Sequence, residues 1–466
     1  MDPSGDLRAF FEPEGVVIAG ATRSPGFGYI LPKALQRQGW GDRLYLVNPA
    51  GGEVHGMPLY TTVSEVPEKV DLAVIIVPAT AVAETLEELG SRGIRHAIIE
   101  SAGFAETGEA GKTMQLEVSE AASRHQIRVI GPNCVGVINT ENRFSTVEIM
   151  DEALTPGSLA VIAQSGVFGN ILLDALHQKG LFISKAVTLG NRMDVDECEV
   201  LDYLHHDPRT GVIMMYLEGA ADGRKLISTL QRVTRDKPVL VLKSGRTDSG
   251  RRATSSHTGS LSGEDLLYEA AFRQSGAIRV ESLEEMVEMA RVFTTQPLPS
   301  GRRLGILTSS GSLGALATDA AVEAGLEVPS LSSETVEKVR SVAPEWMNVR
   351  NPLDVGPSGQ FLTALEALMD DPVVDMVLTI SVMPYAVLRE FISLGLKVED
   401  WLGDASGVRG KAPGKPLVVC SIGDRGFVSD LDEALGPQTP LLDSPEIAAR
   451  SLAALYRYRL TRDAGA

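Results

Sequence analysis

An internal duplication is the feature that most limits what this chain can fold into. The segment "VIAQSGVFGNILLDALHQKGL" (161–181) aligns without gaps to "ILTSSGSLGALATDAAVEAGL" (306–326), with seven identical positions. Further pairs follow in the same order: "GNRMDV" with "RNPLDV", "KPVLVLKSGR" with "KPLVVCSIGD", and "ESLEEMVEMARVF" with "DSPEIAARSLAALYRYR". Such a repeat predicts two similar α/β domains. All seven histidines lie at or before His257, so a reactive histidine could serve only the first copy.

The first ~140 residues show a different alternation of strands and helices. Short, continuously apolar runs are typical of strands buried on both faces of a parallel sheet. The runs are "VVIAGA", "RLYLVNP", "DLAVIIVP", "HAIIES" and "IRVIGPN". Residues 81–92 and 113–125 have helical spacing, which indicates a βαβ domain. A polar stretch at 140–157 suggests a boundary, and we expect three α/β domains over 1–145, 146–297 and 298–466.

Composition excludes several functional classes. A net charge of −18 disfavours nucleic acids and anionic membrane surfaces, which would repel the chain. The most apolar window, 72–83, is interrupted by Pro78 and is too short to span a bilayer. The N-terminal residues show no signal-peptide pattern, so a cytoplasmic protein is expected. The three cysteines are too scattered for a disulfide framework or a thiolate metal site, and no metal site is predicted.

A glycine-containing turn follows the first predicted strand. In "VVIAGATRSPGFGYILPKAL", residues Gly20, Gly26 and Gly28 would let backbone amides approach a phosphate at a helix N-terminus. A nicotinamide cofactor would require an acidic residue at the end of the second strand, but Asn48 stands there. Either another nucleotide-bearing ligand or a turn without a ligand remains.

Two later motifs also follow predicted strands or precede helices. "GEAGKT" (108–113) resembles a P-loop but has Glu106 where that motif needs glycine, so an ordinary helix start is expected. "GPNCVGVIN" (131–139) would direct the Asn133 amide and the Cys134 side chain into a crevice at the sheet edge. A lone cysteine can equally be a buried packing group.

The Ser-Gly pair of the first duplicated segment offers a site for an anion. The Ser165 hydroxyl and the amides after Gly166 would lie at the start of a helix, although a plain helix cap explains the same residues. Gln164 precedes Ser165, so the serine-hydrolase pattern is absent.

The segment "SSHTGSLSG" (255–263) places His257 among small polar residues. We expect a loop that leaves a strand at Lys243 and enters a helix near Glu264. His257 has no apolar neighbours that would make it a core residue, and His205 and His206 supply no matching metal-ligand set. Two interpretations remain: a mobile histidine that accepts a group, or a solvated loop histidine.

Ten segments in this order resemble the alpha subunit of the ADP-forming (NDP-forming) acyl-CoA synthetases, relatives of succinyl-CoA synthetase. The segments are "GATRSPGFG", "VNPAGGEVHGMPLY", "DLAVIIVPA", "ESAGFAETGEAG", "GPNCVGVIN", "AQSGVFGN", "GNRMDVDE", "YLEGAADGRKL", "SSHTGSLSG" and "RNPLDV". The resemblance implies a CoA-binding Rossmann-like domain followed by two flavodoxin-like domains.

It also implies roles for individual residues. His257 matches the histidine that is phosphorylated during turnover, Glu218 matches the carboxylate that orients it, and Ser165 and Gly166 match the phosphoryl-binding helix start. The implied CoA-binding residues are Gly20, Thr22, Pro25, Gly26, Gly28, Asn48, Pro49, Val77, Pro78, Ser101, Asn133 and Cys134. The implied reaction is acid + CoA + ATP ⇌ acyl-CoA + ADP + phosphate, by way of a phosphohistidine and an acyl phosphate.

Two positions depart from the family pattern. Ala50 follows Pro49 where relatives often have lysine, so a phosphate contact to CoA is either missing or supplied by Arg23. "SSGSLG" replaces the Gly-Gly-Pro-Gly turn in the last domain, so no role is carried over to Ser310 or Gly311.

The family's ATP-grasp domain has no counterpart in this sequence. ATP, ADP and Mg are therefore expected on a separate beta subunit, in an alpha2beta2 assembly. The alternative is a non-catalytic CoA- or acyl-CoA-binding regulatory protein of the same fold, which the presence of His257, Glu218, Ser165 and Gly166 disfavours. A nicotinamide dehydrogenase is disfavoured by Asn48.

Overall fold

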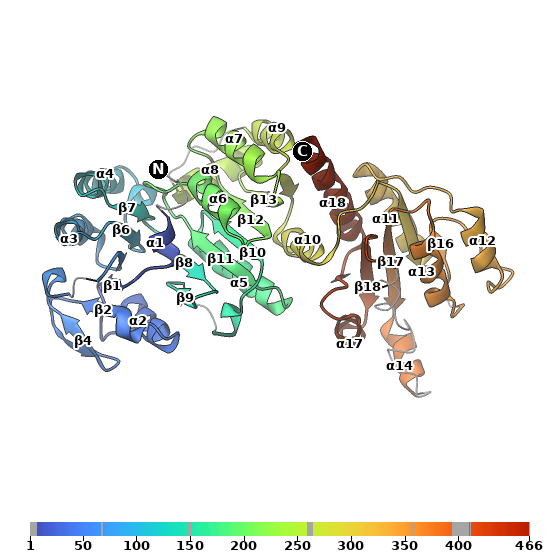
Figure 1. The fold of residues 1–466 in the computed structure, drawn as a ribbon, viewed down its shortest axis with the longest axis horizontal. Coiled ribbons are helices and arrows are strands. Elements are labelled where there is room, and N and C mark those ends of the chain that lie inside the picture. The colour runs from blue at the N-terminus through green and yellow to red at the C-terminus, as the bar shows by residue number, and fades with distance from the viewer. Residues whose placement is uncertain are drawn as a thin grey trace. The chain divides into compact units, whose positions relative to one another are not determined.

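The computed structural model describes residues 7–66, 69–147, 151–258, 264–356, 358–393, 410 and 412–465, without the side chains of 255–258, 388 and 391–393. Within these ranges the chain forms three β-sheets covered by helices (Figure 1). Contacts divide the chain into two compact units, Met1–Met286 and Val287–Ala466. The first two sheets belong to the first unit and the third sheet to the second.

The first sheet has the strand order β3-β4-β2-β1-β5-β6-β7, and only β3 runs antiparallel to its neighbour. Its strands are β1 (Val16–Ala19), β2 (Leu44–Val47), β3 (Gly52–Val54), β4 (Met57–Tyr60), β5 (Leu72–Ile75), β6 (His96–Ile99) and β7 (Arg128–Ile130). Its helices are α1 (Arg8–Phe11), α2 (Phe27–Arg37), α3 (Ala79–Ser91) and α4 (Glu109–Arg124), with 3-10 turns η1 (Gly41–Arg43), η2 (Val63–Glu65) and η3 (Ala105–Thr107). The six parallel strands follow the Rossmann order.

All five apolar runs of the N-terminal region therefore form strands, as predicted. The hairpin β3–β4 was not predicted. Its two strands are only three and four residues long. Gly52 and Glu53 are exposed in β3, and Pro58 interrupts β4, so neither segment is long and apolar enough to be recognised as a strand.

The second sheet has the order β14-β13-β12-β10-β11-β8-β9. Its strands are β8 (Gly136–Asn139), β9 (Phe144–Ser145), β10 (Leu159–Ala163), β11 (Ile183–Thr188), β12 (Val212–Leu217), β13 (Val239–Lys243) and β14 (Ile278–Val280). The helical segments are η4 (Asp151–Leu154), α5 (Gly166–Gln178), α6 (Glu197–His206), α7 (Gly223–Val233), α8 (Asp248–Thr258) and α9 (Asp265–Ser275). Helix α10 (Leu283–Thr295) begins in the first unit and continues into the second, where Arg291 donates to the Leu441 carbonyl of the third sheet. Strands β8 and β9 add antiparallel to β11, so residues 136–145 already contribute to the second sheet.

The third sheet repeats the parallel part of the second, in the order β16-β15-β17-β18-β19. It contains β15 (Leu304–Thr308), β16 (Leu353–Asp354), β17 (Met376–Met383), β18 (Leu417–Gly423) and β19 (Leu441–Leu442). Its helices are α11 (Gly311–Glu323), α12 (Ser333–Arg340), α13 (Phe361–Asp370), α14 (Tyr385–Ser393), α17 (Arg425–Leu435) and α18 (Pro445–Gly465). Both copies have the flavodoxin-like strand order, which confirms the duplication.

The predicted pairing of "GNRMDV" with "RNPLDV" is wrong. Ala163 of β10 lies beside Thr188 of β11, and Thr308 of β15 lies beside Asp354 of β16. Because Ala163 and Thr308 are equivalent in the duplication, Asp354 corresponds to Thr188. "RNPLDV" thus ends in a strand, whereas "GNRMDV" follows one, and the similar letters arose at different places in the fold.

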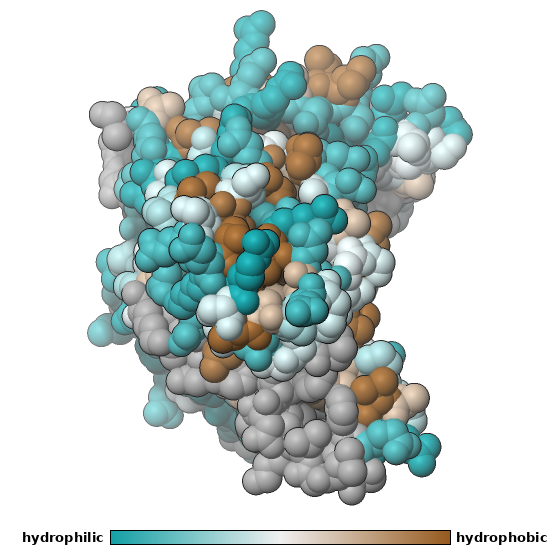
Figure 2. All heavy atoms as spheres, turned by 90° about the vertical axis from the view of Figure 1, so that its right-hand side faces the viewer, coloured by the Kyte–Doolittle hydropathy of each residue, from teal (hydrophilic) through white to brown (hydrophobic). Residues whose placement is uncertain are grey.

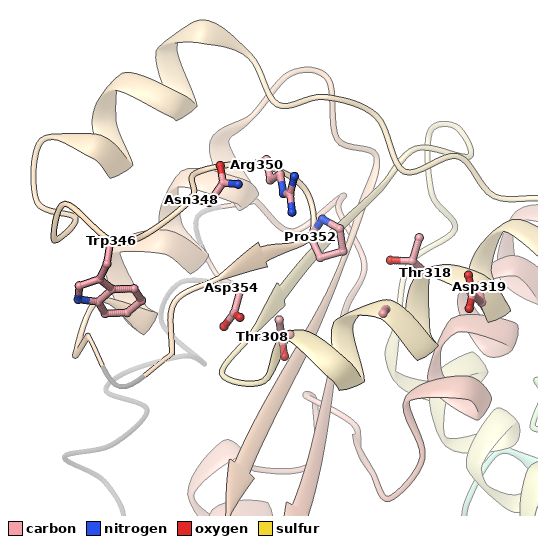
Figure 3. A pocket seen from close by; sticks show the side chains of 10 residues that line it. Thr308, Thr318, Asp319, Trp346, Asn348, Arg350, Pro352 and Asp354 are labelled. Atoms are coloured by element: carbon pink, nitrogen blue, oxygen red, sulfur yellow. The ribbon is translucent and has the colours of Figure 1, made fainter.

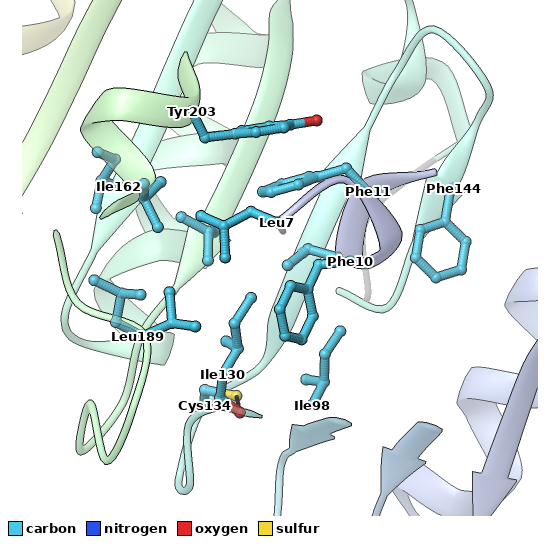
Figure 4. Packing of buried hydrophobic residues seen from close by; sticks show 14 of the residues in the cluster. Leu7, Phe10, Phe11, Ile98, Ile130, Cys134, Phe144, Ile162, Leu189 and Tyr203 are labelled. Carbon is cyan, nitrogen blue, oxygen red and sulfur yellow. Dashed lines mark hydrogen bonds between the residues drawn. The ribbon is translucent and has the colours of Figure 1, made fainter. Parts of the chain in front are cut away.

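The first unit has a hydrophobic core shared by its two sheets (Figure 4). Short helix α1 contributes Phe10 and Phe11, which are fully buried. Phe11 stacks on Tyr203 of α6 with ring centroids 4.8 Å apart, and Phe10 meets His96 of β6 edge to face. Helix α1 therefore packs between β6 of the first sheet and elements of the second sheet, β8 and α6.

The surface is of mixed polarity. Figure 2 shows one face on which hydrophilic side chains predominate, with hydrophobic groups interspersed. In the described part of the chain, no helix combines the length and hydropathy needed to cross a bilayer.

Candidate functional site

The glycine-containing turn lies at the carboxyl end of β1 and packs closely on its surroundings. A Cβ added to Gly28 would lie 2.4 Å from the carbonyl oxygen of Gly20, and one on Gly20 would lie 2.8 Å from the Ile76 carbonyl group. The Thr22 amide also donates to the Gly28 carbonyl at 2.9 Å. Gly26 faces open space at φ +148°, beside exposed Pro25. Two of these glycines thus allow close backbone contacts, and the third leaves open space beside the start of α2.

Asn48 ties two neighbouring strand ends together. Its Nδ2 donates to the Ala21 carbonyl at 2.7 Å, and its Oδ1 accepts from the Ala50 amide at 3.0 Å. Because the side chain both donates and accepts, these bonds explain why Asn48 stands where a dinucleotide fold has a carboxylate. Pro49 beside it is exposed, and a Cβ added to Gly52 in β3 would lie 3.1 Å from the Arg23 guanidinium.

The ends of β5, β6 and β7 would form the other side of the predicted crevice. The Ser101 hydroxyl donates to the Val77 carbonyl at 2.6 Å, and the Asn133 amide donates to the Ser101 carbonyl at 3.0 Å. Pro78 is exposed, and Val77 and Asn133 are half-buried. The predicted residues from five strand ends therefore meet along one edge of the first sheet, where doubly wound folds bind ligands.

The expectation that Cys134 directs its thiol into this crevice is wrong. Its side chain is 4% exposed, belongs to the hydrophobic core and lies 3.4 Å from the Ile99 carbonyl (Figure 4). Burial raises the pKa of the Cys134 thiol. The preceding Asn133 has φ +60°, which turns the chain so that the next side chain faces inward. Only the Cys134 backbone can line the crevice.

The loop between β7 and β8, which contains Asn133 and Cys134, also contacts the start of α5 in the second sheet. A Cβ on Gly166 would lie 3.1 Å from Cγ1 of Val135, so glycine permits the close approach. Thr188 of β11 fixes the same loop, because its hydroxyl accepts from the amides of Val135 at 2.8 Å and Gly136 at 3.0 Å. The crevice of the first sheet and the Ser-Gly turn of the second are therefore adjacent.

Ser165 caps helix α5. Its hydroxyl accepts from the Phe168 amide at 3.4 Å, while Ser165 and Gly166 stay half-buried. The first amides of the helix point toward this end, where the helix dipole favours an anion. Ser165 can therefore cap the helix and still lie at a site that suits an anion.

Glu218 follows β12 and is 3% exposed. Gln164 clamps its backbone: Gln164 Oε1 accepts from the amides of Glu218 at 2.6 Å and Gly219 at 3.1 Å. Gln164 Nε2 also donates to the Gly219 carbonyl at 2.8 Å. Because Gln164 directly precedes Ser165, the helix start and Glu218 are held as one rigid group.

Lys243, the last residue of β13, is a buried lysine, although its sequence position predicted only a strand end. It is 2% exposed and donates to the Ser244 carbonyl, and its ammonium lies 4.5 Å from the centroid of the Tyr268 ring. Burial lowers the pKa of Lys243 to about 8, although the charges of Asp265 and Glu218 act in the opposite direction. In the sequence, the only sign of this buried lysine is a charged residue at the end of an apolar run.

His257 lies in the last turn of helix α8, not in an extended loop as predicted. The helix was missed because "DSGRRATSSHT" has no apolar periodicity and is rich in weak helix formers. Helix α8 contacts η3 of the first sheet. The His257 side chain and residues 259–263 lie outside the described part of the chain.

The P-loop-like segment forms an ordinary helix start, as predicted. Helix α4 begins at Glu109, and the Glu106 carboxylate accepts from the amides of Gly103 at 2.6 Å and Phe104 at 3.1 Å. Burial opposes its ionisation, but these bonds and one from Asn191 at 2.6 Å keep the pKa of Glu106 below its usual value. The Glu106 carboxylate therefore stabilises the turn before α4, which accounts for an acidic residue where a P-loop has its first glycine.

A cavity of about 450 Å³ lies beside α11 at the equivalent end of the third sheet (Figure 3). Polar groups on its wall include Arg350, Asn348, Asp319 and Asp354. A Cβ on Gly311 would lie 2.9 Å from Oδ2 of Asp354, so a carboxylate stands at the start of this helix. The equivalent position beside the start of α5 is the Thr188 hydroxyl, and the two copies therefore differ in charge.

Two family models match the chain. The "CoA binding domain" model matches residues 14–140, and the "Succinyl-CoA ligase like flavodoxin domain" model matches residues 156–293. These ranges contain the first sheet with its crevice and the parallel strands of the second sheet.

Curated relatives match most of the chain. The acetate–CoA ligase (ADP-forming) II subunit alpha of Pyrococcus furiosus is 37% identical over 97% of both chains. The acetate–CoA ligase (ADP-forming) II of Archaeoglobus fulgidus is 37% identical over 92% of this chain, which spans only 63% of that relative. The 4-hydroxybutyrate–CoA ligase (ADP-forming) of Nitrosopumilus maritimus is 32% identical over 96% of this chain and 63% of the relative.

A solved structure has the same fold. Acetyl-coenzyme A synthetase 1 of Ca. Korarchaeum cryptofilum, described as dinucleotide forming and in complex with phosphate and ADP, gives a TM-score of 0.84 at 29% identity. The match covers 98% of this chain and 97% of that one. The chain therefore belongs to the ADP-forming acyl-CoA ligase family, the acid–thiol ligases, and corresponds to its alpha subunit.

Proposed function

We propose that this chain supplies the CoA site and the phosphohistidine of the reaction acid + CoA + ATP ⇌ acyl-CoA + ADP + phosphate. The observation that carries the proposal is the contact between two strand-end sites. The crevice of the first sheet meets the start of α5 at Val135 and Gly166, and Gln164 holds Glu218 beside that helix.

We assign CoA to the crevice. The glycine turn leaves backbone amides accessible at the start of α2, which suits the diphosphate of the ligand. The remaining crevice residues would contact CoA along the strand ends, with Cys134 acting only through its backbone. The proposed set is Gly20, Thr22, Pro25, Gly26, Gly28, Asn48, Pro49, Val77, Pro78, Ser101, Asn133 and Cys134.

We assign the phosphoryl carrier to His257. In the direction of acyl-CoA synthesis, an imidazole nitrogen would take the γ-phosphoryl group from ATP, with ADP leaving. A carboxylate oxygen of the acid would then attack the phosphorus and release the histidine, and the CoA thiolate would displace phosphate from the acyl phosphate. The Ser165 hydroxyl and the α5 amides would hold the phosphoryl oxygens, and Glu218 would orient the imidazole.

We further propose that ATP, ADP and Mg²⁺ bind to an ATP-grasp beta subunit, in an alpha2beta2 assembly. The word "alpha" in the relatives' names supports a partner chain. Longer relatives such as the A. fulgidus ligase have room for further domains in one polypeptide. ATP and CoA are metabolites of the cell interior, which supports a cytoplasmic location.

The proposal can be tested by reconstitution with a beta subunit of an ADP-forming acetate–CoA ligase. Beyond the one ADP per active site that accompanies phosphorylation of His257, ADP release should depend on acid and CoA, require both chains and be lost in His257→Ala. Acetate and 4-hydroxybutyrate are the first acids to test, because relatives are named for them. CoA binding without ADP release in any combination would instead favour the non-catalytic regulatory protein.

A further inference from the structure

Tyr216 contacts the carboxylate of Glu218 directly. Tyr216 is the penultimate residue of β12, and its half-buried hydroxyl donates to Oε1 of Glu218 at 3.3 Å. Residues two apart on an extended segment point to the same side, so this contact follows from the backbone. Gln164 fixes the Glu218 backbone, whereas Tyr216 touches the ionisable group itself.

The ring of Tyr216 is held by helix α5. It stacks on Phe168 with centroids 3.9 Å apart and ring planes at 19°. Phe168 lies in the first turn of α5, and its amide donates to the Ser165 hydroxyl at 3.4 Å. The stack therefore joins the helix start to the hydrogen bond on Glu218.

We propose that Tyr216 is a positioning residue, held by Phe168, that fixes the direction of the Glu218 carboxylate. The inference rests on the proposed function, in which Glu218 orients His257. A donor on one carboxylate oxygen restricts rotation of the carboxylate plane, so its lone pairs point to a defined position. Phe168 also donates its amide to the Ser165 hydroxyl. The phosphoryl-binding helix start and the orienting carboxylate therefore keep a constant separation.

The test uses the full chain and follows phosphorylation of His257 from acyl-CoA and radiolabelled inorganic phosphate in a single turnover. The acyl-CoA is whichever of acetyl-CoA and 4-hydroxybutyryl-CoA labels the wild type. Tyr216→Phe keeps the stack and removes only the hydroxyl. We expect the labelling rate to fall about tenfold, as for loss of a hydrogen bond to a charged group. The acyl-CoA concentration that gives half the maximal rate should stay unchanged.

Tyr203→Phe is the matched control. It removes the hydroxyl of another tyrosine that is stacked on a phenylalanine in the same unit, at a centroid distance of 4.8 Å, and should label at the wild-type rate. A merely structural role of Tyr216 would change the folded fraction or the half-saturation and leave the rate of the folded protein unchanged.

Phe168→Leu provides a second, independent variant. It removes the stack, keeps the Tyr216 hydroxyl and should also slow labelling. Because both residues act through Glu218, the double variant should be no slower than the slower single variant. Tyr216→Phe at the wild-type rate, or a double variant whose loss is the product of both single losses, would overturn the inference. An unlabelled wild type would overturn the proposed function and this inference with it.

Discussion

Replacement of Lys243 by methionine should change how the stability of the first unit depends on pH. The buried ammonium has a pKa lowered from 10.5 to about 8, mainly by desolvation. Below pH 8 the folded state keeps a charge that burial disfavours. At about 1.4 kcal/mol for each pH unit, the cost is about 3 kcal/mol relative to the unfolded chain.

The sign of the effect follows from proton binding. Between pH 8 and pH 10.5 the unfolded chain holds the Lys243 proton more often than the folded chain, so stability rises with pH across this window. From pH 7 to pH 9 the free energy of unfolding of the wild type should increase by about 1.3 kcal/mol relative to Lys243→Met.

Urea unfolding at the two pH values would measure this difference. In a Trp346→Phe, Trp401→Phe background, Trp40 reports the first unit, where it is 2% exposed and packs on Phe144. Lys33→Met removes a positive charge from an exposed position and controls for net charge. A wild-type-minus-variant difference that is the same at pH 7 and pH 9 would refute the buried-charge argument.

Two further perturbations test the crevice and its support. Gly28→Ala forces a Cβ to 2.4 Å from the Gly20 carbonyl oxygen, so it should destabilise the unit by about 1–3 kcal/mol and weaken CoA binding in calorimetry. Gly41→Ala, with its nearest contact at 3.6 Å, should leave both values unchanged, and equal effects would contradict the packing argument. Arg128→Met removes ion pairs to Asp194 at 2.9 Å and Glu199 at 2.7 Å and should lower the free energy of urea unfolding by about 1.5–3 kcal/mol. A loss under 0.5 kcal/mol would show that these ion pairs do not support the unit.

The sequence predicted the features that depend on local patterns. Apolar runs located the strands of the first sheet, and the duplicated Ser-Gly segment predicted the strand–turn–helix units that begin at Leu159 and Leu304. Asn48 stands where dinucleotide sites have a carboxylate, and its bonds to neighbouring loops, one donated and one accepted, explain the amide.

Features that depend on contacts between residues far apart in the sequence could not be predicted from local patterns. The direction of Cys134 depends on the positive φ of Asn133, and the burial of Lys243 depends on Tyr268, which lies one helix further along the chain. The Tyr216–Phe168 stack joins two elements separated by one strand and one helix in sequence, so neither residue stood out. Helix α8 lacks the apolar stripe by which a helix is recognised.

The central claim, that His257 carries the phosphoryl group, is tested most directly by labelling the chain without a partner. After incubation with acyl-CoA and radiolabelled phosphate, the account predicts an acid-labile, base-stable label on the peptide that contains His257, and no label in His257→Ala. A label that persists in His257→Ala, or a wild-type chain that binds CoA and stays unlabelled, would contradict it.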